Sequence, residues 1–159
     1  MRWLSLFLVL MIIVVAVTSA SAAELNGFRG FKWGTELKVF LGEEKKGVEG
    51  HMGAVPDVDA YQFKNEDLNV GGVKVNSIIY SFFKGKLTAV NIDFQGFDNL
   101  EKMRAYCLKL FGPAIGSATM RTEYYAGFDS PRTGALLLYQ LTLPTASPGR
   151  LYLYSKELL

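Results

Sequence analysis

Three kinds of side chain in this sequence could carry out chemistry: a single histidine, a single cysteine and a few neighbouring carboxylates. His51 lies in a glycine-rich stretch shortly before Asp57 and Asp59. A histidine paired with a carboxylate is a common general acid–base unit, and this pair is the basis for one hypothesis, a small hydrolase-like enzyme. Such a role needs a cleft that positions both groups, and the sequence shows none. We favour the alternative, in which His51 is a solvated loop residue, and assign no catalytic residue.

The cysteine and the acidic residues do not predict a metal site or a reactive thiol. Cys107 falls on the apolar side of a predicted helix, where burial makes a thiol inert. With one histidine and one cysteine, the usual zinc ligand sets cannot form without carboxylates. Asp57-Val58-Asp59 lacks the remaining oxygen ligands and the glycine of a calcium loop. We therefore expect no metal and no cofactor.

The first residues have the pattern of a secretory signal. A short basic start with Arg2 leads into the uncharged apolar run Leu4–Val17, and Ala20-Ser21-Ala22 fits the small-residue rule for signal peptidase. An uncleaved membrane anchor is the alternative, but the run is shorter than the roughly 20 residues that a spanning helix needs. We predict cleavage after Ala22, a periplasmic or secreted location, and one domain over residues 23–159.

The composition limits the partners of that domain. The formal net charge is +2 and no long run of like charge occurs, so no basic face for nucleic acid is predicted. Half of the residues are hydrophobic, with 11 phenylalanines and 8 tyrosines, which is enough for a sizeable core without an internal disulfide. The partner we expect is another envelope protein or an apolar ligand, bound by a monomer or weak oligomer without a transmembrane segment after cleavage.

The strongest structural signal is a β-hairpin over residues 73–94. The preferred interpretation has a three-residue loop, Phe83–Gly85, with Gly85 in the left-handed conformation. A two-residue loop, Lys84–Gly85, is the alternative, but it would mix the apolar and polar faces of the strands. The first interpretation places Ile78 opposite Val90, Tyr80 opposite Thr88 and Asn76 opposite Ile92.

This register separates the hairpin into two faces. The even-numbered residues form an apolar face that we expect to be buried: Ile78, Tyr80, Phe82, Val90, Ile92 and Phe94. The odd-numbered face is mostly polar but contains Ile79, Phe83 and Leu87. The sequence leaves open whether the protein covers this second face or exposes it.

The elements around the hairpin predict an α+β fold. A helix is expected over 97–112, with Asp98 and Glu101 as a capping box and an apolar stripe through Leu100, Met103, Cys107 and Leu110. A shorter helix over 36–41 is expected to start at Thr35 and stop at Gly42. Strands are expected near 57–63, 122–128, 135–143 and 150–156. The order suggests two helix–strand–strand–strand units forming an antiparallel sheet with two helices packed on one face.

Several aromatic and apolar residues fall on strands where one side could face solvent. Tyrosine and tryptophan favour interfaces because one end of each side chain is apolar and the other polar. Ordinary packing on both faces of the sheet is the alternative explanation. The function we expect is a non-enzymatic binding or envelope-associated module. Its candidate binding residues are Trp33, Ile79, Phe83, Tyr124, Tyr125, Tyr152 and Tyr154.

Five segments carry a resemblance to known proteins: residues 28–35, 71–73, 79–87, 110–113 and 151–156. With its opening Phe-x-Gly-x-x-Trp-Gly-Thr segment, the chain resembles a loose group of small exported bacterial proteins, largely uncharacterised. The resemblance implies export in a Gram-negative bacterium and an α+β fold, and it carries over no catalytic residue. The two-unit order is also similar in outline to envelope modules of the outer-membrane-assembly lipoprotein and β-lactamase-inhibitor-protein type, a likeness that does not define function.

Overall fold

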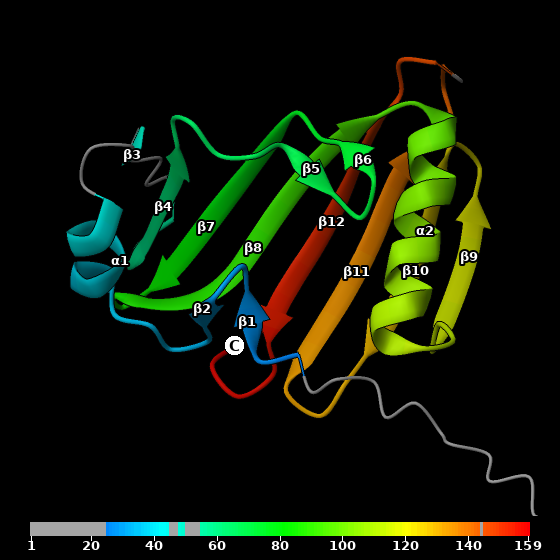
Figure 1. The fold of residues 1–159 in the computed structure, drawn as a ribbon. Coiled ribbons are helices and arrows are strands. Elements are labelled where there is room, and N and C mark those ends of the chain that lie inside the picture. Colours follow the sequence, from blue (N-terminus) through cyan, green and yellow to red (C-terminus); the bar gives the residue numbers. More distant parts are fainter. Residues whose placement is uncertain (1–24, 45–47, 50–54, 144) are drawn as a thin grey trace, which may run out of the picture.

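A computed structural model describes residues 25–44, 48–49, 55–143 and 145–159. About half of them belong to β-strands, and two helices interrupt the strands (Figure 1). The elements are β1 (Gly27–Phe28), β2 (Phe31–Lys32), α1 (Leu37–Glu44), β3 (Val48–Glu49), β4 (Val58–Phe63), β5 (Asn69–Val70), β6 (Val73–Lys74), β7 (Ser77–Phe83), β8 (Lys86–Gln95), α2 (Phe97–Phe111), β9 (Gly116–Met120), β10 (Glu123–Asp129), β11 (Thr133–Gln140) and β12 (Pro148–Ser155).

The described strands form one large antiparallel sheet of eight, with the order β3-β4-β7-β8-β12-β11-β10-β9. One half of this sheet consists of β3, β4, β7 and β8, which follow α1, and the other half consists of β9 to β12, which follow α2. The two halves join where β8 pairs with β12. Two short hairpins, β1–β2 and β5–β6, lie in front of the main sheet in Figure 1 and contribute Phe28, Val70 and Val73 to the core. The predicted antiparallel sheet with two helices, an α+β composition, is confirmed.

The turn of the central hairpin differs from the predicted one. Phe83 pairs with Lys86, so the loop contains only Lys84 and Gly85, and the expected three-residue loop is wrong. Both loop residues are left-handed, with φ of 49° and 74°, as in a type I′ turn. The favourable twist of that turn outweighs the strain of a left-handed lysine.

A β-bulge explains why the two-residue loop does not mix the faces. The register shifts between Ser81 and Phe82, and Thr88 is the extra residue on β8. Beyond the bulge the pairs differ from the predicted ones: Tyr80 lies opposite Val90, and Ile78 lies opposite Ile92. The displacement is two residues, which keeps every side chain on its predicted face. Leu87 is the exception, because the bulge moves it from the odd-numbered face into the core.

The even-numbered face of the hairpin is buried, as predicted, and it forms the centre of the hydrophobic core. From α1, Phe40 contributes a fully buried ring whose centroid lies 4.7 Å from that of Phe63, 4.8 Å from that of Phe82 and 5.1 Å from that of Tyr80. From α2, the ring centroid of Phe111 lies 6.2 Å from that of Phe128 on β10. The buried stripe of α2 is Leu100, Met103, Cys107 and Phe111, with Leu110 at its edge.

The helix ends correct two predictions. The N-cap residue of α2 is Gly96, and no side chain caps the helix, so Asp98 lies inside the first turn and the capping box is wrong. The C-terminal end at Gly112 agrees with the sequence. In α1, Gly42 lies within the helix and does not end it. Thr35 directs its hydroxyl to the carbonyl of Lys32, before the helix begins.

A polar cluster fastens the segment before β5 to the core. The hydroxyl of Tyr80 donates to Oε1 of Glu66 (2.5 Å), and Nη1 of Arg29 donates to the same oxygen (2.9 Å). Arg29 also donates to the carbonyls of Asp67 and Asn69. Burial raises the pKa of the Glu66 carboxyl, and the hydrogen bond from Tyr80 and the charge of Arg29 oppose that rise.

The segment 113–121, where no strand is predicted from the sequence, contains the edge strand β9. Its first residues are small, the strand shows no clear alternation, and β10 supplies the pairing that makes it a strand. Among the residues that the structure describes, no helix has the length and apolar character needed to cross a membrane.

Candidate functional site

The face of the sheet opposite the core carries several half-exposed or exposed apolar side chains. Alternation along each strand sends one set of residues into the core and the other set to this second face. We call the second face the open face, because its members are half-exposed or exposed in the structure. It comprises Ser77, Ile79, Ser81, Phe83, Asn91, Asp93, Ala118, Tyr125, Leu136, Leu138, Arg150, Tyr152 and Tyr154.

One row of residues crosses the open face from β10 to β7. Tyr125 lies opposite Leu138, Leu138 opposite Arg150, Arg150 opposite Asp93, and Asp93 opposite Ser77. Side chains directly opposite on neighbouring antiparallel strands are close enough to interact. The row therefore runs continuously from an aromatic ring and an apolar side chain to a charged pair and a hydroxyl.

A hollow of about 340 Å³ lies at one end of this row. The side chains of Tyr125 and Leu138 give it an apolar part, and Glu123, Arg150 and Asp93 surround that part with charge. Ligand sites commonly combine an apolar surface with a few fixed polar groups in this way. The hollow is open, so its shape suits a side chain or a segment of a partner.

The charged pair in the row is held by three hydrogen bonds. Arg150 donates from Nε to Oδ1 of Asp93 (2.6 Å) and from Nη2 to Oδ2 (3.2 Å), and the Ser77 hydroxyl donates to Oδ2 (3.0 Å). The hydrogen bond with Asp93 raises the pKa of Arg150, so the guanidinium stays charged. Because Arg150 is exposed, the pair contributes little to stability. Its main effect is to fix the direction of the guanidinium fork.

The structure brings most of the predicted binding residues together on the open face. Tyr125 lines the hollow, and Tyr152 and Tyr154 stack on each other with ring centroids 5.5 Å apart. Burial raises the pKa of Tyr152, whose hydroxyl therefore stays protonated near neutral pH. Ile79 and Phe83 lie on the same face along β7.

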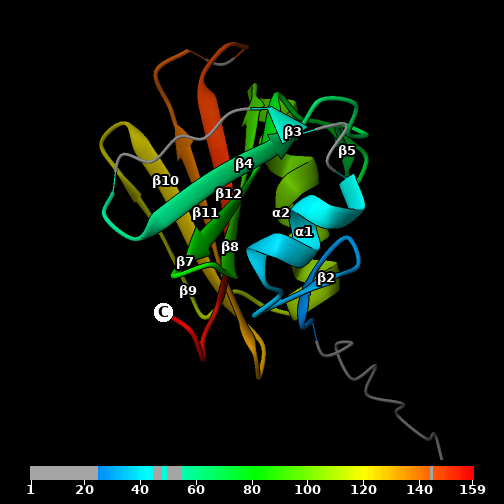
Figure 2. The ribbon, with the colours of Figure 1, turned by 90° about the vertical axis from the view of Figure 1, so that its left-hand side faces the viewer.

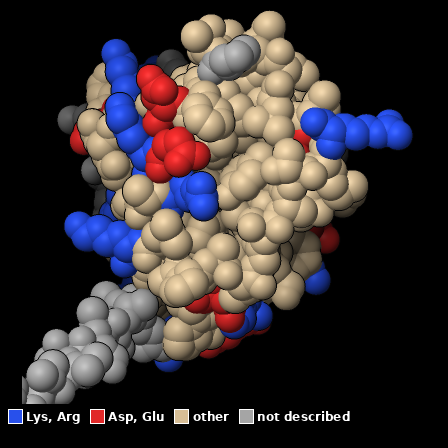
Figure 3. Space-filling model, turned by 90° about the vertical axis from the view of Figure 1, so that its right-hand side faces the viewer, with Lys and Arg blue, Asp and Glu red and all other residues tan. Residues whose placement is uncertain are grey.

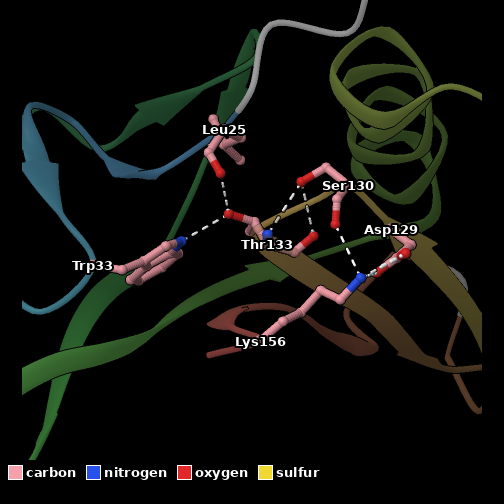
Figure 4. Close-up of polar contacts among 6 residues, drawn as sticks. All are labelled: Leu25, Trp33, Asp129, Ser130, Thr133 and Lys156. Atoms are coloured by element: carbon pink, nitrogen blue, oxygen red, sulfur yellow. Dashed lines mark hydrogen bonds and ion pairs between the residues drawn. The ribbon is translucent and has the colours of Figure 1, made fainter. Parts of the chain in front are cut away.

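Two predicted residues, Trp33 and Tyr124, do not belong to the open face. The indole Nε1 of Trp33 donates to the Thr133 hydroxyl (2.7 Å), which in turn donates to the carbonyl of Leu25 (Figure 4). Trp33 thereby fastens the segment before β1 to the start of β11, which is a structural role. Tyr124 lies opposite Tyr139 and packs against the hydrophobic core, and it also contributes to the lining of the hollow.

The acid–base and thiol candidates are not part of the open-face row. His51 lies outside the described residues, so the hydrolase-like hypothesis stays a prediction. Asp57 has a left-handed φ of 62° in the turn before β4, and its carbonyl accepts a hydrogen bond from the amide of Lys84 (2.9 Å). Cys107 is fully buried on α2, and burial raises the pKa of its thiol to about 12. Across the described ranges, no group of three His, Cys, Asp or Glu side chains could hold a metal ion.

Sequence reasoning missed Leu138 and the Arg150–Asp93 pair. One signal was present: Arg150, Tyr152 and Tyr154 alternate with buried leucines on β12 and so share a face. The pairing of β12 with β11 and β8 brings Leu138 and Asp93 beside Arg150. The local sequence does not specify which strands pair.

No protein-family model, curated protein or solved structure matches this chain.

Proposed function

We propose that this chain is an exported, periplasmic, non-enzymatic binding module that recognises its partner through the open face. One observation carries the proposal: the row from Tyr125 through Leu138 to the Arg150–Asp93 pair is solvent-accessible although the protein already has a complete core on the other face. Exposed apolar side chains that gather beside polar ones are typical of interaction sites.

We propose further that both helices cover one face of the sheet, in two helix–strand–strand–strand units, and so leave the other face free. Phe40 of α1 contacts Tyr80 and Phe82, and Phe111 of α2 contacts Phe128, all from core-facing positions. Figure 2 supports this arrangement, because α1 and α2 are both seen to the right of the long strands.

The proposed location follows from the first 22 residues. Their basic start, apolar run and small-residue exit favour export and cleavage after Ala22. The resemblance to small exported bacterial proteins points in the same direction.

The chemistry of the open face favours a protein partner or an apolar ligand. Stacked Tyr152 and Tyr154 offer broad rings with polar ends, and Leu138, 39% exposed, offers an apolar contact. Arg150, already oriented by Asp93, has a guanidinium that can also meet a carboxylate or carbonyl of the partner.

The test compares two leucine substitutions of matched exposure. We recover three tagged proteins from cells: the wild type, Leu138→Glu and Leu108→Glu. Proteins that co-purify with each are identified by mass spectrometry. In a separate measurement, each protein is titrated with a fluorescent apolar probe. Leu108 is 44% exposed on α2, away from the open face. We expect Leu138→Glu to weaken binding about tenfold or more and Leu108→Glu to leave it unchanged, since a buried unpaired charge costs more than 1.4 kcal/mol. Equal binding by all three proteins would contradict the proposal.

A further inference from the structure

The strand β9 is an unprotected edge of the sheet. In the described sheet, β10 is its one neighbour, so the opposite side of its backbone faces outward. Its sequence, Gly-Ser-Ala-Thr-Met, has no charge and no proline. The strand β4, near the other edge, carries Asp59 and is partly covered by β3. Edge strands usually carry charges, proline or bulges that prevent further pairing, and β9 has none of them.

We propose that β9 pairs antiparallel with β9 of a second copy of this chain, about a two-fold axis at Ala118. This register pairs all residues of the strand: Ala118 lies opposite Ala118 of the second copy, Gly116 opposite Met120, and Ser117 opposite Thr119. The same patch then serves both copies, as a two-fold interface requires. The proposal is independent of what the open face binds.

The side chains of β9 complement one another in this register. Met120 is 61% exposed, and it meets Gly116 of the second copy, where a Cβ atom would find nothing within 4 Å. The large side chain of one strand therefore fills the space that the glycine of the other leaves open. Ser117 and Thr119 can exchange a hydroxyl hydrogen bond across the pair. No like charges face each other within the strand.

The surroundings of β9 also fit a second copy. Ile115, 75% exposed just before the strand, falls opposite Arg121 of the second copy, whose aliphatic stem can cover it. Figure 3 looks onto this side of the molecule, and uncharged side chains fill most of the middle and right of the view, while most charged ones gather toward its left. An unrelated extended peptide could pair with the same backbone edge, but the glycine–methionine match is specific to β9 itself.

The pairing would join the two sheets into one. Opposite residues of an antiparallel pair point to the same side, and Ala118 belongs to the open face of each copy. The two open faces would thus become one continuous surface. Because β9 is short, we expect a weak dimer whose population depends on concentration.

Sedimentation equilibrium of the protein recovered after expression of the whole chain tests the proposal. We expect a reversible dimer below about 1 mM protein. Ala118→Lys and Ala118→Glu each place like charges face to face and should raise the dimer dissociation constant at least about tenfold. An equimolar mixture of the two variants should associate again, because lysine then meets glutamate. Leu108→Lys, on α2, is the matched control and should leave the constant unchanged.

A disulfide trap gives a second readout that does not depend on affinity. Opposite residues of an antiparallel pair have Cα atoms about 4.5–5.5 Å apart, within the range of a disulfide. Ala118→Cys should therefore form a covalent dimer under mild oxidation, and Leu108→Cys should not. The proposal is overturned if the wild type stays monomeric up to about 1 mM. It is equally overturned if Ala118→Lys dimerises as strongly as the wild type, or if both cysteine variants cross-link alike.

Discussion

Two glycines in the sheet lie beneath aromatic rings, and the same substitution at each should have different costs. Gly149 lies opposite Phe94, and an added Cβ atom would lie 2.3 Å from Cε2 and Cζ of that ring. Gly134 lies opposite Tyr154, and its added Cβ would lie 2.2 Å from Cζ of that ring. Both rings must therefore move by about 1 Å or more to reach ordinary contact.

The surroundings of the rings decide the cost. Phe94 is buried and stacks on Tyr139, with ring centroids 6.3 Å apart and planes 12° apart, so its ring cannot move without disturbing the core. Overpacking of this kind lowers the free energy of unfolding by about 1–3 kcal/mol. Replacing glycine also restrains the unfolded chain, which raises the free energy of unfolding by about 0.4–1 kcal/mol. We predict a net loss of about 1–2 kcal/mol for Gly149→Ala. The half-exposed Tyr154 can turn toward solvent, so Gly134→Ala should change stability by no more than about 0.5 kcal/mol.

Urea unfolding of the two variants measures this difference. Phe94→Leu in the Gly149→Ala background makes room for the new methyl group, so the double variant should be more stable than the two single losses predict, by about 1 kcal/mol. If Gly149→Ala and Gly134→Ala cost the same, or if Phe94→Leu gives no coupling, the reasoning from ring burial is refuted.

Three other predictions concern the core and its buried polar groups. Phe40→Ala removes the fully buried ring of α1. It should lower the free energy of unfolding, measured by urea denaturation, by about 3–5 kcal/mol. A loss below about 1 kcal/mol would show that α1 does not depend on this ring. The Cys107 thiol, whose pKa burial raises to about 12, should react with an aqueous disulfide reagent at pH 8 only after denaturation, and an equal rate in the native protein would contradict its burial. The pKa of Glu66 is raised in the folded state, chiefly by burial, so folding takes up protons above the ordinary glutamate pKa. Relative to Glu66→Gln, the wild type should therefore lose stability as the pH rises from about 4 toward 7. If the free energy of unfolding of the wild type instead increased with pH relative to that of Glu66→Gln, the hydrogen bonds from Tyr80 and Arg29 would outweigh desolvation.

Alternation predicted the faces of the central hairpin better than it predicted the turn. Side chains on a strand alternate between its two faces. Ile78, Ile92 and Phe94 therefore face the core in any register that differs from the predicted one by an even number of residues. The left-handed Lys84 and the bulge at Thr88 are two departures from regular geometry that compensate each other. A pattern read one strand at a time cannot detect such a compensation.

The edge strand and the capping of α2 were missed for local reasons. The segment Gly116–Met120 begins with small residues and shows no clear alternation, and the neighbouring strand β10 determines its conformation. Asp98 has the right type for an N-cap, but Gly96, with a φ of 87°, turns the chain two residues earlier.

The candidate site was predictable only along single strands. Tyr152 and Tyr154 share a face because they are two residues apart, which the sequence shows directly. The position of Leu138 beside Arg150, and of Arg150 beside Asp93, depends on which distant strands pair and in which register. Trp33 was placed among the binding residues because of its residue type, whereas its indole is used for the bond to Thr133.

Site-specific photo-crosslinking in cells tests the role of the open face most directly. A benzoylphenylalanine replaces either Tyr152 on the open face or Phe97 on α2, so that one aromatic residue substitutes for another at both places. Phe97 is 46% exposed and serves as the matched control. We predict a discrete cross-linked partner, larger in mass than this chain alone, from the Tyr152 position and none from the Phe97 position. Cross-linking from Phe97 alone, or the same products from both positions, would contradict it.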